Sequence, residues 1–223
     1  MLDYLVIIAF SKCQLYSALL ETPGILSASL RSWRLCGLFK GSIGHDLVGR
    51  GNWRTQADVI GQGMFTDIGS HILDLMLWLG KGVPAQVASF AQSTGAPAII
   101  SALAHLDNGV LLSLAFNDAV SGGDELKFYG QGRMTFYGNR GLITADWSRL
   151  MTTEAEQIWL EQEGVRTQVE PAFETIHPAA AFVATVLDGA PNLAPAHEAA
   201  HVVALTAAAY QSAATGQVIQ LER

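Results

Sequence analysis

A long run of short alternating segments constrains the fold of this chain more than any other feature. Between residues 86 and 170, apolar and polar residues alternate with the two-residue period of half-buried strands, and glycine-containing turns separate the segments. Asp107-Asn108-Gly109 is a strong signal for a tight turn between two strands. The expected strands are Gln86 to Gln92, Ile99 to Leu106, Val110 to Phe116, Leu126 to Tyr129, Arg133 to Tyr137, Leu142 to Ala145, Gln157 to Gln162 and Arg166 to Glu170.

The first sixty residues have weaker signals. The β-branched run within Leu5 to Phe10 is typical of a short buried strand, and Lys12 to Thr22 has helical spacing that ends at a Pro-Gly pair. Ile25 to Leu35 alternates like a strand. The segment from Phe39 to Asp58 is rich in glycine and polar residues, so we expect a long loop, and long loops in compact domains are often functional.

Three further segments have helical periodicity. Thr66 to Leu79 carries apolar residues at three- and four-residue steps, and Ala172 to Leu187 and Ala196 to Thr215 follow near the C-terminus. Val218 to Leu221 can add a last strand. Many successive strands followed by helices predict an α+β fold, with a mostly antiparallel, open-faced sheet and helices on one face.

Composition excludes several classes of protein. Half of the 223 residues are hydrophobic and 15% are charged, which suits a chain with a sizeable core. The net charge of -7 and the scattered Lys and Arg residues argue against a nucleic-acid partner. Leu5 to Phe10 is too short to span a bilayer, so no membrane partner is expected. Two cysteines, Cys13 and Cys36, are too few for a disulfide framework, and we expect a cytoplasmic protein.

The start of the helix expected at Thr66 to Leu79 concentrates groups that can do chemistry. Asp67, His71 and Asp74 are spaced so that all three lie on one helix face. A carboxylate beside an imidazole favours the imidazolium and orients it, and such a histidine can exchange a proton with a hydroxyl or carbonyl oxygen. The alternative is an ordinary Asp–His pair on a helix surface, because such pairs are common at this spacing.

This part of the chain resembles the glucose–fructose oxidoreductase/inositol dehydrogenase (Gfo/Idh/MocA) family. The most specific likeness lies in Trp53-Arg54 followed by GQGMFTDIGSHILD at residues 61–74, and in the tail at residues 209–218. The turn at residues 107–109 and the strand pair at residues 134–143 fall in the family's order but are weak signals. The resemblance implies an oxidoreductase acting on a sugar or polyol with NAD or NADP.

The resemblance also implies roles for individual residues. His71 matches the family's acid/base histidine, and Asp67 matches the aspartate that orients it and contacts substrate. Trp53, Arg54 and Asp74 are candidate substrate-binding residues. Arg54 would meet a substrate hydroxyl or a cofactor phosphate, or else is a surface charge, and Asp74 is otherwise structural.

Two parts of the family's machinery do not occur in these 223 residues. There is no Gly-x-Gly-x-x-Gly after a strand and no Glu-Lys-Pro, which carries the family's catalytic lysine. By the resemblance, residues 1–24 would be the end of a cofactor domain and residues 25–223 the substrate and oligomerisation domain. We therefore expect no dinucleotide to bind this chain alone and the chain to be inactive alone. A fragment, a truncated reading frame and a natural cofactor-less relative all fit these observations.

Two other interpretations stay open. In the family the uncovered sheet face pairs subunits, so the domain could serve as an oligomerisation or interaction module, as a homodimer or higher oligomer. Separately, His197-Glu198-Ala199-Ala200-His201 matches the H-E-x-x-H signature of zinc hydrolases, whose two histidines share a metal. The motif lies in the first turns of its helix, where an acidic residue is also favoured by the helix dipole.

Overall fold

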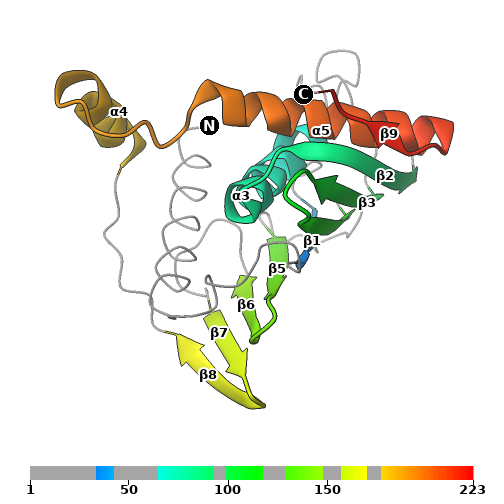
Figure 1. The fold of residues 1–223 in the computed structure, drawn as a ribbon, viewed down its shortest axis with the longest axis horizontal. Helices are drawn as coiled ribbons and strands as arrows, with labels where there is room; N and C mark the ends of the chain where they lie inside the picture. Colours follow the sequence, from blue (N-terminus) through cyan, green and yellow to red (C-terminus); the bar gives the residue numbers. More distant parts are fainter. Residues whose placement is uncertain are drawn as a thin grey trace.

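A nine-stranded sheet forms the body of the computed structural model (Figure 1), which describes residues 34–42, 65–92, 99–117, 129–147, 157–169 and 177–222. The strand order is β8-β7-β6-β5-β1-β4-β3-β2-β9. Only β1 and β4 pair in parallel; every other neighbouring pair is antiparallel. The strands are β1 Arg34–Ser42, β2 Pro84–Gln92, β3 Ile99–Leu106, β4 Leu111–Asn117, β5 Tyr129–Tyr137, β6 Leu142–Trp147, β7 Gln157–Gln162, β8 Val165–Val169 and β9 Ile219–Gln220.

Three helices and one π-helical turn complete the described part. The π-helical turn η3, Phe65–Gly69, leads directly into α3, Ser70–Gly80. The remaining helices are α4, Pro178–Leu187, and α5, Ala196–Thr215. Helix α5 packs on β2 and β9, and α3 packs against α5 and β1 (Figure 1), so these two helices share one side of the sheet. The α+β fold class expected from the sequence is confirmed.

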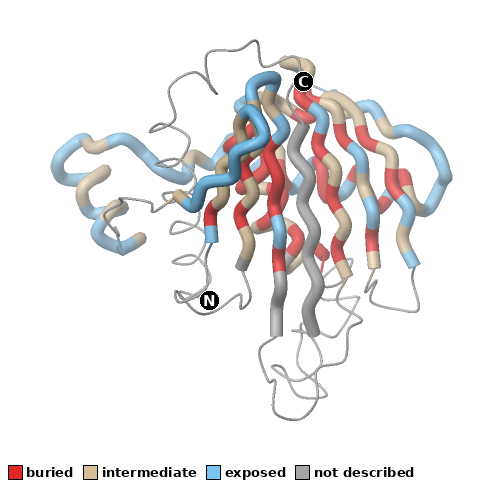
Figure 2. Tube along the Cα trace, turned by 90° about the horizontal axis from the view of Figure 1, so that it is seen from below, coloured by how far each residue is buried: buried red, intermediate tan, exposed pale blue. Residues whose placement is uncertain are grey.

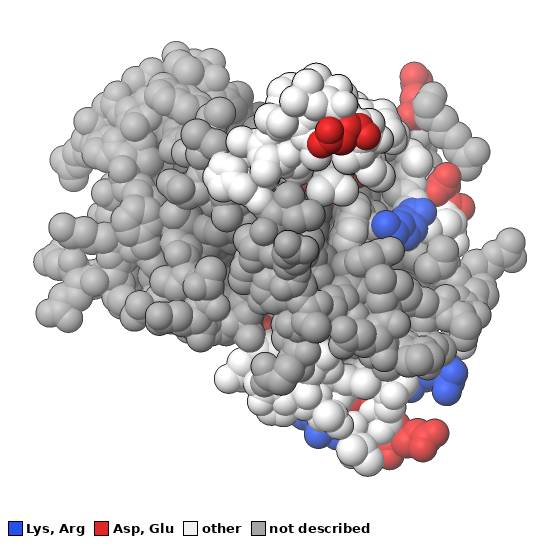
Figure 3. Space-filling view, turned by 90° about the vertical axis from the view of Figure 1, so that its left-hand side faces the viewer, with Lys and Arg blue, Asp and Glu red and all other residues white. Residues whose placement is uncertain are grey.

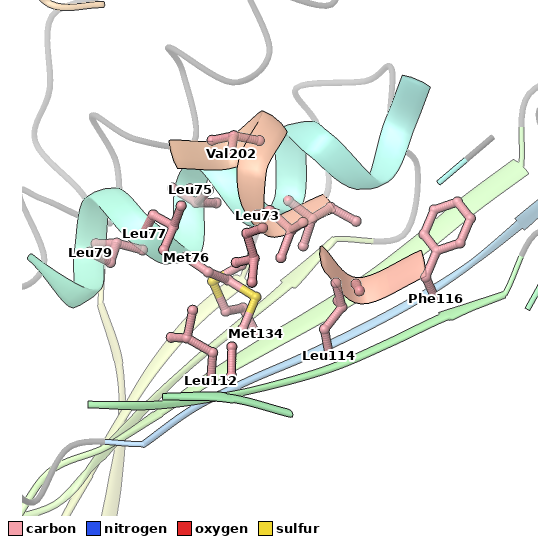
Figure 4. Close-up of a cluster of buried hydrophobic side chains, with 14 of the residues drawn as sticks. Leu73, Leu75, Met76, Leu77, Leu79, Leu112, Leu114, Phe116, Met134 and Val202 are labelled. Carbon is pink, nitrogen blue, oxygen red and sulfur yellow. The ribbon is translucent and has the colours of Figure 1, made fainter. Parts of the chain in front are cut away.

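The core lies between α3, α5 and this side of the sheet. Alternate residues of β3 and β4 are buried, as the banding along each strand shows (Figure 2). Met76 of α3 lies near Met134 of β5, above Leu112 and Leu114 of β4 (Figure 4). Because these side chains are almost completely buried, each contributes roughly 1.5–3 kcal/mol of transfer free energy.

Two of our expectations about strand limits are wrong. Residues 39–42, expected to begin a long loop, belong to β1, and residues 130–132, expected to form a turn, lie within β5. These two strands pair with each other along their whole length, from Arg34 opposite Tyr137 to Ser42 opposite Tyr129. Cross-strand hydrogen bonding therefore overrides the weak strand preference of glycine in both segments.

The other expected elements agree in kind. β3, β7 and α5 have the expected bounds, and the remaining described strands differ by a few residues at their ends. The expected strand at Leu5 to Phe10, the helix at Lys12 to Thr22, the strand before Arg34 and the loop after Ser42 lie outside the described residues, as do residues 126–128 and 170–176. The proposed boundary at residue 24 lies there too.

Helix α4 has no buried residue. Its apolar side chains are largely exposed, including Phe182 at 70% and Leu187 at 75%, and it extends away from the sheet (Figure 1). Over the described residues, no helix is long and apolar enough to cross a membrane.

Candidate functional site

The residues singled out from the sequence lie where η3 passes into α3. Asp67 belongs to η3, while His71 and Asp74 belong to the first turns of α3. All three are partly exposed, whereas Ile72, Leu73 and the next apolar residues of α3 are buried. Asp67, His71 and Asp74 therefore lie on the partly exposed side of η3 and α3, together with Ser70 and Trp78. Each of the three candidate residues interacts with another group.

The π-helical turn is a local departure from the expected regular helix. Short π-helical turns inside helices are rare and occur frequently at functional sites. Here the turn contains Asp67, and the Ser70 hydroxyl donates a hydrogen bond to the Asp67 carbonyl oxygen at 2.8 Å. Ser70, the first residue of α3, thus binds the backbone carbonyl of Asp67, whose side chain is the candidate carboxylate.

An aromatic cluster anchors this turn. Phe65 is fully buried, and its ring meets the rings of Phe116 and Tyr210 edge-to-face, each with centroids 5.6 Å apart. These contacts fasten the start of η3 to β4 and α5 at once. Gly69 completes the arrangement, because the Phe65 ring lies against the position that a side chain at Gly69 would occupy.

Tyr210 is the titratable member of this cluster. Burial raises the pKa of Tyr210 to about 12, and the neighbouring Thr66 opposes that rise only in part. The phenol oxygen is buried and makes no hydrogen bond of ordinary geometry. Spacing in the sequence did not indicate this residue as part of the site, because Tyr210 approaches η3 only through the packing of α5.

The sequence also singled out residues outside η3 and α3. Trp53 and Arg54 lie outside the described residues. His197 is exposed and Glu198 and His201 are partly exposed at the start of α5. Within the described residues, no three His, Cys, Asp or Glu side chains gather closely enough to hold a metal ion, so the zinc-hydrolase interpretation finds no third ligand there.

The described surface has two further features. On the face in Figure 3, acidic and basic side chains of the described residues are interspersed, without a basic patch that would favour nucleic acid. A hollow of about 630 Å³ lies at the β7–β8 end of the sheet, and Asp67 and His71 do not line it. Its lining residues are Asn139, Arg140, Leu160, Gln162, Glu163, Val165 and Thr167.

Comparison with protein families supports the resemblance found in the sequence. Residues 37–144 match the model of the GFO/IDH/MocA C-terminal domain. This range contains Asp67, His71 and Asp74. No protein of curated function matches the sequence.

Solved structures show the same fold. The aldose-aldose oxidoreductase from Caulobacter crescentus, complexed with glycerol, is similar with a TM-score of 0.73 and 15% identity, over 94% of this chain and 62% of that one. A levoglucosan dehydrogenase complexed with NADH and L-sorbose is similar with a TM-score of 0.71 and 14% identity, over 100% of this chain and 65% of that one. An Agrobacterium radiobacter oxidoreductase complexed with NAD+, L-tartaric acid and magnesium is similar with a TM-score of 0.65 and 17% identity, over 94% of this chain and 61% of that one. The present chain thus spans about three fifths of the length of these proteins.

Proposed function

Because residues 37–144 match the model of the GFO/IDH/MocA C-terminal domain, we propose that this chain is the substrate-binding part of a nicotinamide-dependent oxidoreductase acting on a sugar or polyol. The observation that carries this proposal is the placement of Asp67, His71 and Asp74 at an aromatic-anchored π-helical turn. Sugar-like ligands in two of the similar structures, glycerol and L-sorbose, support the substrate class.

The chemistry we assign to this chain is proton transfer at a substrate oxygen. His71 accepts the proton when a hydroxyl is oxidised and returns it when a carbonyl is reduced. Asp67 orients the His71 imidazole and accepts a hydrogen bond from the substrate. Asp74, one helical turn beyond His71, contributes to substrate binding. Trp53 and Arg54 are proposed to contact the substrate from the preceding segment.

The residues present do not fit a dinucleotide site, because the sequence has no Gly-x-Gly-x-x-Gly that could approach a pyrophosphate. Isothermal titration of the 223-residue chain with NAD and NADP is expected to show no binding at micromolar concentrations. Micromolar binding of either one would contradict this part of the proposal.

Binding of small polyhydroxy compounds tests the site directly. We expect glycerol and L-sorbose to perturb amide NMR signals of residues 65–74, with Asp67→Asn and His71→Ala each weakening the affinity about tenfold or more. Losing a hydrogen bond to a charged group costs roughly 1.5–3 kcal/mol, which corresponds to that change. The matched controls are Asp188→Asn and His177→Ala beside α4, which should leave the affinity unchanged. Perturbations that cluster elsewhere would argue against the site.

The open side of the sheet favours a second function, subunit pairing. Phe90, Leu103 and Leu111 lie on the side of β2, β3 and β4 opposite the core, and they are 80%, 62% and 44% exposed. The register pairs Leu103 with Ala88 and Ser113, Phe90 with Ser101 and Leu111 with His105. The three apolar side chains are therefore diagonal neighbours on this side of the sheet, and none of these pairs contains Asp, Glu, Lys or Arg. Contiguous apolar patches of this kind mark interaction sites.

Sedimentation equilibrium distinguishes this second function from a monomeric domain. We expect the chain to form a homodimer or higher oligomer, and the double variant Phe90→Asp/Leu103→Asp to be monomeric, because two buried carboxylates would face each other across the interface. Phe182→Asp, on the exposed surface of α4, is the control and should keep the oligomer. A wild-type chain that sediments as a clean monomer would rule out pairing through this face.

A further inference from the structure

The phenol group of Tyr210 is at odds with its surroundings. The residue is 8% exposed, and within the described part of the chain its hydroxyl is the only buried side-chain oxygen or nitrogen without a hydrogen bond of ordinary geometry. Burying an unsatisfied hydroxyl costs free energy, whereas phenylalanine would fill nearly the same space without that cost. Packing alone therefore does not account for a tyrosine here.

The surroundings of Tyr210 are the residues just before the candidate carboxylate. Its ring packs edge-to-face on Phe65, and its hydroxyl lies next to Thr66. Asp67 is the next residue. One side chain of α5 thus contacts both residues that lead the backbone into Asp67.

The turn at this point depends on such support. A π-helical turn is less favourable than a regular α-helix and persists where its surroundings hold it. The Phe116 ring also packs edge-to-face on Phe65, and Gly69 leaves room for the Phe65 ring. Thr66 lies beside the Tyr210 hydroxyl and directly precedes Asp67 in the chain. The position of Thr66 therefore affects how the backbone of Asp67 leads into α3.

We propose that Tyr210 is a positioning residue for the Asp67–His71 pair: it acts through Phe65 and Thr66 to hold the π-helical turn so that Asp67 faces His71. The proposal rests on the proposed function, because it treats this pair as the acid–base site. Tyr210 itself is not assigned any contact with substrate.

The pKa of the His71 imidazole, measured by NMR titration of the intact chain, reports this positioning without requiring turnover. A carboxylate held against an imidazole raises the imidazole pKa. We expect Asp67→Asn to lower the His71 pKa by about one pH unit or more, and Tyr210→Phe to lower it by about half a unit. Thr66→Val, which removes the hydroxyl that faces Tyr210, should have the same effect as Tyr210→Phe and should add little to it.

Two control variants separate positioning from a general loosening of α5. Ser212→Ala removes a hydroxyl from the same helix, one that accepts from the Ser89 amide at 2.9 Å and donates to the Gln217 carbonyl oxygen at 2.6 Å. Tyr137→Phe removes a phenol hydroxyl from a largely exposed ring on β5. Both should leave the His71 pKa unchanged, even if Ser212→Ala lowers the stability.

The outcomes are distinguishable. If Asp67→Asn lowers the His71 pKa while Tyr210→Phe and Thr66→Val leave it unchanged, the positioning role is overturned and the acid–base pair stands. If Asp67→Asn itself has no effect, Asp67 and His71 are not paired, and the proposed function loses its main support together with this inference. A drop of equal size in Ser212→Ala would also overturn the role assigned to Tyr210, because it would reflect helix loosening.

Discussion

Replacing Gly69 by alanine is expected to lower the free energy of unfolding by about 2–4 kcal/mol. The backbone is not the reason, since Gly69 has the helical angles φ -62° and ψ -31°, and alanine is the better helix former by about 1 kcal/mol. Space is the reason. An ideal Cβ at this position would lie 2.7 Å from Cε2 and 3.0 Å from Cγ of Phe65.

Phe65 cannot easily move away from such a methyl group. Its ring is fully buried, and it is held edge-to-face by Phe116 from β4 and by Tyr210 from α5. Displacing it would either open a cavity in the core or unwind the π-helical turn. Chemical denaturation of the Gly69→Ala variant, monitored by circular dichroism, measures the loss.

A second glycine of the same helix provides the matched control. An ideal Cβ at Gly80 would also be crowded, but the nearest atom, at 2.8 Å, is a terminal methyl carbon of Leu106, and the next two atoms lie at 3.6 Å and 3.8 Å, whereas at Gly69 three atoms of one aromatic ring crowd the position. Gly80→Ala should therefore cost clearly less. In addition, Phe65→Leu combined with Gly69→Ala should cost less than the sum of the single variants, because the smaller side chain relieves the clash. Strict additivity of the two would contradict this explanation.

Local patterns predicted the elements whose stability is itself local. β3 and β7 alternate regularly, and α5 is flanked by Pro195 at its N-cap and by Gly216, in the left-handed conformation, at its C-cap. The limits of these three elements therefore agree with the expectation. β1 and β5 were misjudged where glycine interrupts them. Their strand conformation comes from pairing with each other and with β4 and β6. β1 is far from both of its partner strands in the sequence, so a local sequence pattern does not reveal this pairing.

The candidate site divides in the same way. The spacing of Asp67, His71 and Asp74 is a helical pattern, and all three are partly exposed residues of η3 and α3. The π-helical form of the turn was not expected, since one wide turn barely changes the periodicity. The contacts of Phe65 with Phe116 and Tyr210 could not be inferred either, because they join elements far apart in the chain.

The raised pKa of Tyr210 makes a second prediction, for alkaline solution. The pKa is about 12 in the folded chain against an ordinary value of 10.0. Below pH 10 both the folded and the unfolded chain keep the proton, so the tyrosine does not make stability depend on pH. Between pH 10 and 12 the unfolded chain releases the proton while the folded chain retains it, and stability must therefore fall as the pH rises.

The size of this fall follows from the difference between the two pKa values. Two pH units correspond to about 2.7 kcal/mol, and we expect about 1–2 kcal/mol to be realised, because water reaching the ring edge screens part of the effect. Urea denaturation of the wild type and Tyr210→Phe at pH 9 to 12 measures it. The two free energies of unfolding should differ by a constant amount up to pH 10, and then the wild type should lose stability faster.

Other groups titrate in the same pH range, so the effect of Tyr210 is read from the difference in unfolding free energy between the wild type and Tyr210→Phe. Lysines and the remaining tyrosines affect wild type and Tyr210→Phe alike and cancel in the difference. If the wild-type and Tyr210→Phe curves stay parallel to pH 12, the Tyr210 hydroxyl is accessible to solvent, and the buried, unsatisfied phenol beside Thr66 loses its physical basis.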